Sequence, residues 1–437
     1  MAKLWQKKGY QVEELIEQFT VGNDRELDLA LAKYDILGNK AHAAMLQHTG
    51  ILSKEELQGT HQVLDQLLKQ VEAGEFQIEE GFEDVHSKVE FALTEQLGET
   101  GKRIHTGRSR NDQVLLDMHL YLRAEIQEIK EEVRGLSESL LQQAEEYKDC
   151  LLPGYTHLQV AMPSSFGLWF SAYAEALIDD VYFLNAAYQV ADQNPLGSAA
   201  GYGTSIPLNR SMTTELLGFD TLKYNTVAAQ MSRGKAEKSL SLALSSVGGT
   251  VAKMAMDVCL YMSQNFGFFS LPPELTTGSS IMPHKKNPDV FEVMRGKCNK
   301  VQSLPYELTL LTNNLPSGYH RDFQLLKESL MPAIASIKEC LKIAKYVIPQ
   351  LKVNQEAINA PIYDYLYTVE VVNEEVMKGK SFREAYQTVG ESVENGTYQP
   401  RKSVDHCHEG SIGNLCLNEI REKLERAMAQ LNATPAR

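Results

Sequence analysis

The sequence predicts an all-α protein built around long helices. Three features support this prediction: proline-free stretches, apolar stripes with helical spacing, and a near absence of strand alternation. No proline precedes Pro153, and none lies between Pro207 and Pro272. Because proline breaks the interior of a helix, both stretches are free to be helical. The candidate strands, residues 77–78 and 151–152, are too short to build a sheet.

Residues 114–147 are expected to form one long helix. Apolar residues recur every three or four positions, at Leu122, Ile126, Ile129, Val133, Leu136, Leu140 and Ala144. A nearly heptad stripe of this kind faces a core or a neighbouring helix. At ~1.5 Å per residue, the helix is roughly 50 Å long.

Residues 226–266 show a second long helical pattern. Its apolar positions are Met231, Leu240, Leu244, Val247, Val251, Met254 and Val258. Charge is scarce after Lys238, and a helix that is apolar most of the way round is buried. Two long helices, one nearly without charge, indicate a helical bundle that also associates with copies of itself.

Composition excludes several classes of protein. The 437 residues include 43 basic and 57 acidic side chains, a formal net charge of −14, which argues against a nucleic-acid binder. No run of about 18 apolar residues occurs, so we expect no membrane span. The six cysteines are scattered and form no CxxC pair, which favours a reduced, cytoplasmic protein. The length corresponds to two or three domains of ~150 residues each.

The connectors between the long helices are where we expect function, because loops at the ends of a rigid scaffold usually carry it. They are dense in Gly, Ser, Thr, His, Lys and Arg. The connectors span residues 98–110, 153–163, 194–210, 272–288 and 313–321.

Residues 278–289, GSSIMPHKKNPD, form the densest of these segments. Asn287 followed by Pro288 predicts a helix N-cap with proline at the first helical position. Free backbone amides at that helix start, with Lys285 and Lys286 just upstream, suit a bound carboxylate. A basic surface loop is the alternative, but serines, prolines, lysines and an amide in one short string favour a binding or catalytic loop.

Residues 106–113, TGRSRNDQ, form the second segment. Arginine recognises carboxylates through two parallel hydrogen bonds, so Arg108 and Arg110 indicate an anionic ligand. Asn111 or Asp112 instead suits the N-cap of the long helix that follows.

Two weaker signals complete the set of binding candidates. His157, beside Thr156 in a proline-bounded turn, is able to act as an acid or base near neutral pH, although a lone histidine is more often structural. Tyr319, Gln324 and Lys327 have the spacing to lie along one side of a helix start, or else on a solvated face. His406-Cys407-His408 lacks a matching second pair of ligands, so we expect no metal site there.

Together these segments resemble the fumarase/aspartase superfamily. GSSIMPHKKNPD is similar to its signature loop, and RIHTGRSRNDQV is typical of the argininosuccinate lyase family within it. PGYTHLQVAMP, NPLGSAAGYGTSIPLNR and SFREAYQTVG also resemble their counterparts in that family. The similarity runs from about Phe19 to about Gly390.

The resemblance implies three mostly helical domains: an N-terminal domain over residues 1–106, a central long-helix domain with the signature loop over 107–360, and a small C-terminal domain over 361–437. It also implies a homotetramer, in which the central helices form a 20-helix core and each active site takes loops from three subunits.

The resemblance further implies a reaction: reversible β-elimination of argininosuccinate to arginine and fumarate, through an aci-carboxylate carbanion, in arginine biosynthesis. No cofactor or metal is expected. Ser279 is the implied base, Lys285 the stabiliser of the carbanion, and His157 with Glu292 the acid or proton relay. The implied substrate-binding residues are Arg110, Asn111, Thr156, Ser280, Asn287, Tyr319, Gln324 and Lys327.

The N-terminal segment departs from the family pattern. A serine is usual after its first Phe-Asn, whereas this chain reads Phe19-Thr20-Val21-Gly22-Asn23-Asp24. Asp24 is a weak candidate for the N-terminal substrate contact, and we therefore leave it out of the implied site residues. The alternatives are a sister lyase such as adenylosuccinate lyase, fumarase or aspartase, and a crystallin-like structural protein on the same scaffold.

Overall fold

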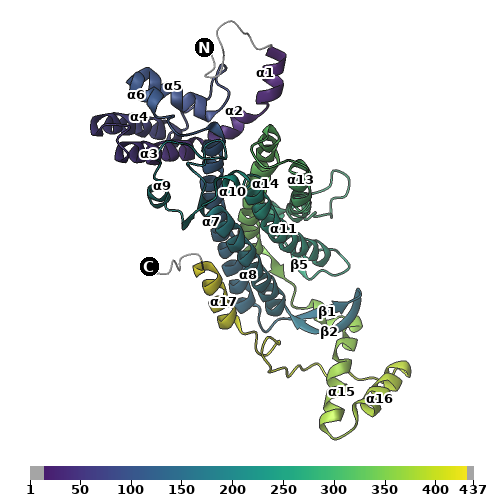
Figure 1. Cartoon of the computed structure of the whole chain (residues 1–437). Coiled ribbons are helices and arrows are strands. Elements are labelled where there is room, and N and C mark those ends of the chain that lie inside the picture. The colour runs from purple at the N-terminus through teal and green to yellow at the C-terminus, as the bar shows by residue number, and fades with distance from the viewer. Residues whose placement is uncertain (1–13, 431–437) are drawn as a thin grey trace.

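The computed structural model describes residues 14–430. Helices dominate this part of the chain, and its strands are short, which confirms the all-α prediction (Figure 1). The helices before the central bundle are α1 (Glu14–Val21), α2 (Asp24–Leu27), α3 (Ala32–His48), α4 (Lys54–Glu72), α5 (Val85–Leu97) and α6 (Glu99–Arg103).

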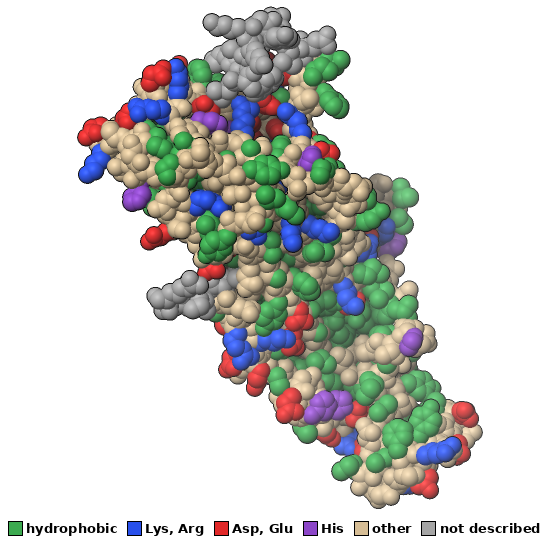
Figure 2. Space-filling view, in the orientation of Figure 1, with side chains coloured by type: hydrophobic (Ala, Val, Ile, Leu, Met, Phe, Trp, Pro, Cys, Tyr) green, Lys and Arg blue, Asp and Glu red, His purple; other side chains and the backbone are tan. Residues whose placement is uncertain are grey.

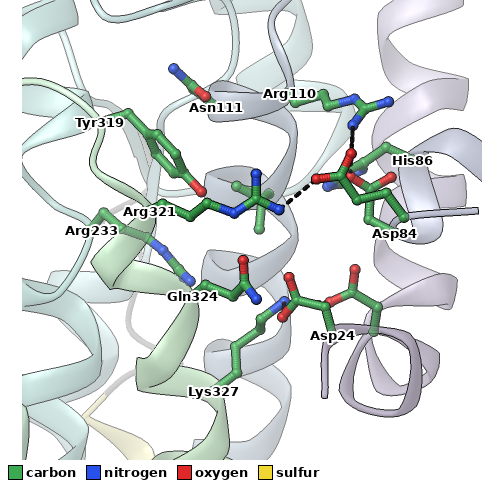
Figure 3. A pocket seen from close by; sticks show the side chains of 13 residues that line it. Asp24, Asp84, His86, Arg110, Asn111, Arg233, Tyr319, Arg321, Gln324 and Lys327 are labelled. Carbon is green, nitrogen blue, oxygen red and sulfur yellow. Dashed lines mark hydrogen bonds and ion pairs between the residues drawn. The ribbon is translucent and has the colours of Figure 1, made fainter. Parts of the chain in front are cut away.

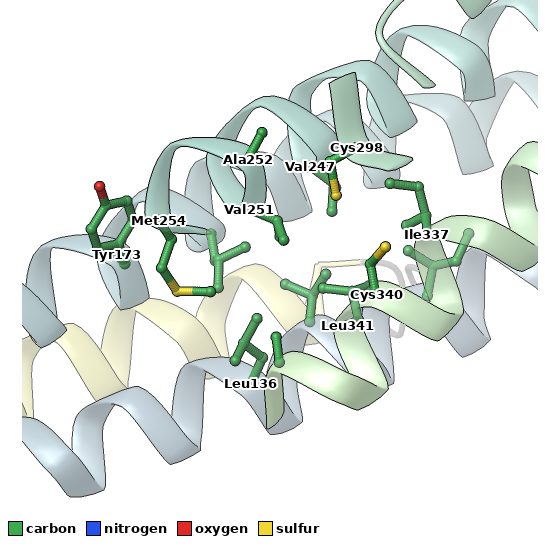
Figure 4. Packing of buried hydrophobic residues seen from close by; sticks show 14 of the residues in the cluster. Leu136, Tyr173, Val247, Val251, Ala252, Met254, Cys298, Ile337, Cys340 and Leu341 are labelled. Atoms are coloured by element: carbon green, nitrogen blue, oxygen red, sulfur yellow. The ribbon is translucent and has the colours of Figure 1, made fainter. Parts of the chain in front are cut away.

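Four long helices form the central bundle: α7 (Arg110–Glu146), α8 (Phe166–Ala191), α11 (Lys235–Tyr261) and α14 (Leu325–Val347). The stripe predicted on the first long helix is confirmed, because Ile126, Val133 and Leu140 are fully buried on α7. They share one core with apolar residues of the other three helices (Figure 4). The shorter helices beside the bundle are α9 (Arg210–Leu216), α10 (Thr226–Gln230), α12 (Asp289–Val301) and α13 (Leu304–Leu311).

The second predicted helix, over residues 226–266, is interrupted. A short α10 ends at Gln230, and α11 begins at Lys235 after Gly234, whose φ of 83° lies in the left-handed region. Met231, which we placed on the buried stripe, lies in this turn and is 56% exposed. The prediction of one continuous helix was therefore wrong at its start, because the positive φ of Gly234 cannot belong to a continuous right-handed helix.

Residues 151–165 form an antiparallel hairpin of β1 (Leu151–Thr156) and β2 (Gln159–Ser165), not the irregular connector we expected. Pro153 pairs with Pro163 across the two strands. Neither proline donates a backbone hydrogen bond, which is why the sequence did not indicate a strand here. The prolines are tolerated because both strands of this two-stranded sheet are edge strands. The other strands have two residues each: β3 (Gln193–Asn194), β4 (Thr221–Leu222), β5 (Phe269–Ser270) and β6 (Lys352–Val353).

The C-terminal part divides between two cores. Helices α15 (Thr368–Met377) and α16 (Phe382–Glu394) pack on each other at one end of the molecule (Figure 1). The last helix, α17 (Leu417–Ala429), returns to the central bundle. There the carbonyl of Ala427 accepts a hydrogen bond from Asn185 of α8 at 2.8 Å.

The central helices also expose large apolar side chains. They come from α8, α11, α12, α13 and α14, and they include Tyr182, Phe183, Leu242, Met256, Val293, Leu310 and Tyr346. Figure 2 shows apolar side chains over much of the visible flank. Exposed apolar surface on this scale is typical of an interaction face. Within residues 14–430, no helix is both long and apolar enough to span a bilayer.

Candidate active site

A cavity of 230 Å³ lies where the start of α7 meets α2, α5 and the start of α14 (Figure 3). It brings together five residues predicted for the substrate site, Arg110, Asn111, Tyr319, Gln324 and Lys327. The remaining charged residues of its lining were not predicted from the sequence: Asp24, Asp28, Glu83, Asp84, His86, Arg233 and Arg321.

Lys327 is held between two carboxylates. Its ammonium lies 2.7 Å from Asp24 and 2.6 Å from Asp28, and its side chain is almost fully buried. Burial by itself lowers the pKa of Lys327, but the two carboxylates outweigh burial and raise it, so this lysine stays charged. For Asp24, burial outweighs Lys327 and raises the pKa to about 6.

Asp24 thus brings the N-terminal segment to the cavity, beside Lys327. It comes from the segment that departs from the family pattern, and no signal in the sequence links it to Lys327, 303 positions later.

Arg110 opens α7 and points across the cavity towards the start of α5. Its guanidinium lies 3.2 Å from both Glu83 and Asp84 and donates to the Ser87 hydroxyl at 3.1 Å. Arg321 reaches the same Glu83 carboxylate at 2.6 Å from the opposite side (Figure 3). The lining therefore alternates cations with carboxylates, which suits a ligand that carries charges of both signs.

Gln324 connects the cavity to the N-terminal helix. Its amide donates to the carbonyl oxygens of Thr20 at 3.1 Å and Val21 at 2.8 Å, the last residues of α1. Figure 3 shows the Tyr319 side chain beside Arg321 on the same wall of the cavity. A single turn of 3₁₀-helix, Arg321–Gln324, precedes α14. Gln324 is its last residue, and Tyr319 lies two residues before the turn begins.

The start of α7 is capped differently from our prediction. Ser109 is the N-cap residue, and its hydroxyl accepts the Asn111 backbone N–H at 3.2 Å. Asp112 completes the capping box by accepting the Ser109 N–H at 2.9 Å. Its second oxygen accepts the N–H groups of Gly197 and Ala199. Asn111 is thereby left to line the cavity, as the substrate-site prediction requires.

A buried cluster of Asp35, His86 and Asp117 lies beneath the cavity. His86 Nδ1 is 2.7 Å from Asp35 and 3.7 Å from Asp117, and all three side chains are buried. Burial opposes charge on the imidazole, but Asp35, joined by Asp117 and Asp84, overcomes burial and raises the pKa of His86 to about 10. Burial and repulsion from Asp35 raise the pKa of Asp117 well above its usual range. His86 is thus a buried imidazolium that helps to keep Asp84 ionised.

The charge on His86 makes stability depend on pH. Because its pKa is about 10 in the folded protein and ~6.5 in the unfolded chain, folding takes up a proton between these values. The stabilising contribution is complete below pH ~6.5 and is lost as pH rises towards 10. We expect the gap in unfolding free energy between wild type and His86→Gln, measured by chemical denaturation, to shrink steadily from pH 7 to pH 10.

His119→Gln is the matched control for this prediction. His119 is equally buried, but its partners are the Ala191 carbonyl and the Ser232 hydroxyl, and burial lowers its pKa to about 4. It is neutral throughout this pH range, so its gap to wild type should stay constant. A constant gap for His86→Gln would show that His86 is not charged.

The signature loop is closed at its base. Thr277 and Asn287 form an antiparallel bridge, in which the Asn287 N–H donates to the Thr277 carbonyl at 2.9 Å. Ser279 and Lys285 therefore belong to one compact loop. The Ser279 hydroxyl oxygen accepts the backbone N–H groups of Ile281 at 3.4 Å and Met282 at 3.1 Å. Donors aimed at this oxygen favour a negative charge on it.

The helix after this loop corrects our capping prediction. α12 begins at Asp289, and Pro288 occupies the cap position without a side-chain hydrogen bond. The Asn287 side chain instead donates to the Thr277 hydroxyl at 3.3 Å and the Gly278 carbonyl at 3.5 Å. Asn287 thus secures the base of the loop. Ser280, Lys285 and Glu292, the last in the first turn of α12, are exposed.

His157 occupies the tip of the β1–β2 hairpin. Thr156 pairs with Gln159, so His157 and Leu158 form a two-residue turn, with φ values of 53° and 58°. Positive φ at both central positions is the type I′ geometry, which normally selects glycine or asparagine. A histidine and a leucine held there store backbone strain, a feature that clusters at functional sites. Thr156 and His157 are both exposed.

The predicted site residues therefore fall into two groups at opposite ends of the bundle. Arg110 begins α7, and the hairpin starts five residues after α7 ends at Glu146. The 37 residues of α7 span ~55 Å. Figure 1 shows the hairpin at the end of the bundle opposite α1–α6. Within one chain, Thr156 and His157 are too far from Arg110 to reach the same small ligand.

The signature loop also lies away from the cavity. α11 starts beside Arg233 and extends for 27 residues, ~40 Å, and α12 runs back along it, with Arg295 against Met256. The loop that precedes α12 is therefore at the far end of α11. In the described part of the chain, none of Thr156, His157, Ser279, Ser280, Lys285, Asn287 and Glu292 lines the cavity.

Known proteins resemble this chain over almost its whole length. A lyase family model matches residues 7–303. The argininosuccinate lyase of Bacteroides fragilis is 55% identical over 98% of this chain and 96% of its own length. The chain belongs to the argininosuccinate lyase family. The family's Parabacteroides distasonis member is 56% identical over 96% of this chain and 94% of its own.

The fold agrees with this family membership. EDDS lyase in complex with formate superposes with a TM-score of 0.75 at 23% identity, covering 97% of this chain and 91% of that one. A fumarate lyase:delta crystallin from Brucella melitensis, bound to cobalt, gives 0.74 at 17% identity, covering 96% and 95%. Members of the argininosuccinate lyase family thus share this helical-bundle fold with more distant lyases.

Proposed function

We propose that this chain is an argininosuccinate lyase, which cleaves argininosuccinate reversibly to L-arginine and fumarate in arginine biosynthesis. The observation that carries the proposal is the paired-charge lining of the cavity, in a chain 55% identical to a named argininosuccinate lyase. Argininosuccinate has an amino-acid end with an ammonium and a carboxylate. Asp24 and Asp28 match the ammonium, and Arg110, Arg321 and Lys327 match carboxylates.

The chemical difficulty is the removal of a weakly acidic C–H proton next to a carboxylate. Ser279 takes this proton, because backbone donors favour its alkoxide and the cations Lys285 and Lys286 belong to the same loop. The electron pair left on carbon spreads onto the carboxylate as an aci-carboxylate, which Lys285 stabilises and Asn287 helps to bind. The C–N bond then breaks, and His157, oriented by Glu292, donates its own proton to the leaving nitrogen, while the proton taken from carbon stays on Ser279. No cofactor or metal takes part in this proposal.

The other substrate contacts divide between the two groups of residues. Arg110, Asn111, Tyr319, Gln324 and Lys327 bind from the cavity. Thr156 binds from the hairpin, and Ser280 binds from the signature loop.

The separation of the two groups supports a site that is shared between subunits. Because α7, ~55 Å long, lies between Arg110 and the hairpin, the hairpin can contribute to the same site only if it comes from another chain. In line with the family resemblance, we propose a homotetramer in which three subunits supply each site, with the exposed apolar faces of the central helices forming a 20-helix core. We also propose three domains, divided at residues 106 and 360, with α17 packing back onto the central domain. We propose that the enzyme is cytoplasmic.

A direct assay tests the proposed function. The protein is incubated separately with argininosuccinate, adenylosuccinate, malate and aspartate, and fumarate is followed by its ultraviolet absorbance. We expect fumarate from argininosuccinate alone. Turnover of adenylosuccinate, malate or aspartate instead would indicate a sister enzyme, and a well-folded tetramer without any turnover would favour a crystallin-like structural protein.

A further inference from the structure

We propose that Arg233 and Glu237 form a buried positioning pair, which fixes the turn that carries Tyr319 and Gln324 in the cavity. This role deepens the proposed function and rests on it for its kinetic consequence. Arg233 lies in the turn between α10 and α11, lines the cavity and is 5% exposed. Its guanidinium contacts Glu237 at 2.6 Å and donates to the Phe323 carbonyl at 3.0 Å.

Glu237 holds the other side of this arrangement. It is 1% exposed, and its second carboxylate oxygen accepts the Gly234 N–H at 2.7 Å at the start of α11. The Glu237 carboxylate therefore binds both the Arg233 guanidinium and the backbone N–H of Gly234 at the start of α11. The two segments also touch directly, because a Cβ added to Gly234 would lie 2.7 Å from Thr312 and 3.4 Å from the Phe323 ring.

The carbonyl that accepts the hydrogen bond from Arg233 lies next to the proposed substrate-binding residues. Phe323 is part of the 3₁₀ turn Arg321–Gln324, so its carbonyl immediately precedes Gln324. The neighbouring residues Arg321 and Asp322 are exposed, Tyr319 is 36% exposed, and the backbone of Gly318 has a φ of 114°. A hydrogen bond from the rigid bundle to this turn limits its freedom and keeps Tyr319 and Gln324 directed into the cavity.

The geometry requires arginine specifically. A guanidinium can bond to a carboxylate and to a carbonyl at once with two nitrogens held in a fixed plane. A lysine keeps the positive charge for Glu237, but its single nitrogen cannot hold both acceptors in this arrangement. Arg233→Lys therefore removes the positioning while it keeps the charge.

The test uses the full-length enzyme. For Arg233→Lys we expect KM for argininosuccinate to rise about tenfold while kcat changes by less than about threefold, because ground-state binding groups are misplaced. We also expect faster amide hydrogen exchange over residues 313–324, which needs no substrate. Glu237→Gln should change both readouts in the same direction, and it provides the test if the lysine variant folds poorly.

Arg123→Lys is the matched control. Arg123 pairs with Asp192 at 3.0 Å and donates to the carbonyls of Leu217 and Gly218, but it does not line the cavity. Its substitution should leave KM and exchange over 313–324 unchanged. Unchanged exchange in both variants of the pair would overturn the proposal, as would a loss of kcat at constant KM. If the wild type has no lyase activity, the proposed function fails, and the exchange data still judge the positioning role.

Discussion

Replacing Ser279 by alanine should reduce turnover of argininosuccinate by roughly a thousandfold or more, the scale expected when a base that acts directly is removed. The substitution leaves the base of the loop intact, because Thr277 and Asn287 hold it without Ser279. The binding residues of the cavity belong to other segments and are untouched. Substrate affinity, measured by calorimetry with the inactive variant, should therefore remain close to the wild-type KM.

Thr276→Ala is the control for this experiment. It removes a hydroxyl just outside the bridge, where Thr276 donates to the Pro273 carbonyl at 3.0 Å. Its turnover should stay near the wild-type value. A near-normal kcat in Ser279→Ala would exclude serine as the base, and the search would then turn to the other groups of the loop and hairpin.

Mixing two inactive variants should restore activity if each site takes its hairpin and its signature loop from different chains. We expect recovery from His157→Asn combined with Lys285→Arg after subunit exchange. In a mixed tetramer, some sites combine the intact hairpin of the Lys285→Arg chain with the intact loop of the His157→Asn chain. Each parent should be nearly inactive, so the recovered rate should stand well above both in the fumarate assay.

The matched control combines two lesions within one loop, Ser279→Ala and Lys285→Arg. Ser279 and Lys285 lie in the same closed loop of one chain, so every loop in the mixture carries one lesion or the other. No recovery is expected from this pair. Absence of recovery from the first pair, after exchange has been verified by mass spectrometry, would show that each site is built from one chain.

Much of the site was predictable because some of its residues lie close together in sequence. Arg110 and the spacing of Tyr319, Gln324 and Lys327 were local signals, and the family resemblance added Asn111. The carboxylates Asp24, Asp28, Glu83 and Asp84 belong to no motif. Only folding places them against the cations, because the paired groups are separated by 26 to 303 positions of chain, and pairing across such distances leaves no local pattern.

The sequence by itself determined the long helices, since their apolar spacing and freedom from proline are properties of neighbouring residues. It also determined which loops carry reactive side chains. Tertiary structure decided where those loops lie, since α7, ~55 Å long, separates Arg110 at its start from the hairpin that carries His157 beyond its end. It decided charge as well: His86 and His119 are both buried, yet carboxylates raise the pKa of His86 and make it an imidazolium, whereas burial lowers the pKa of His119 and leaves it neutral. Burial and neighbours set these states, and both depend on segments far apart in the chain.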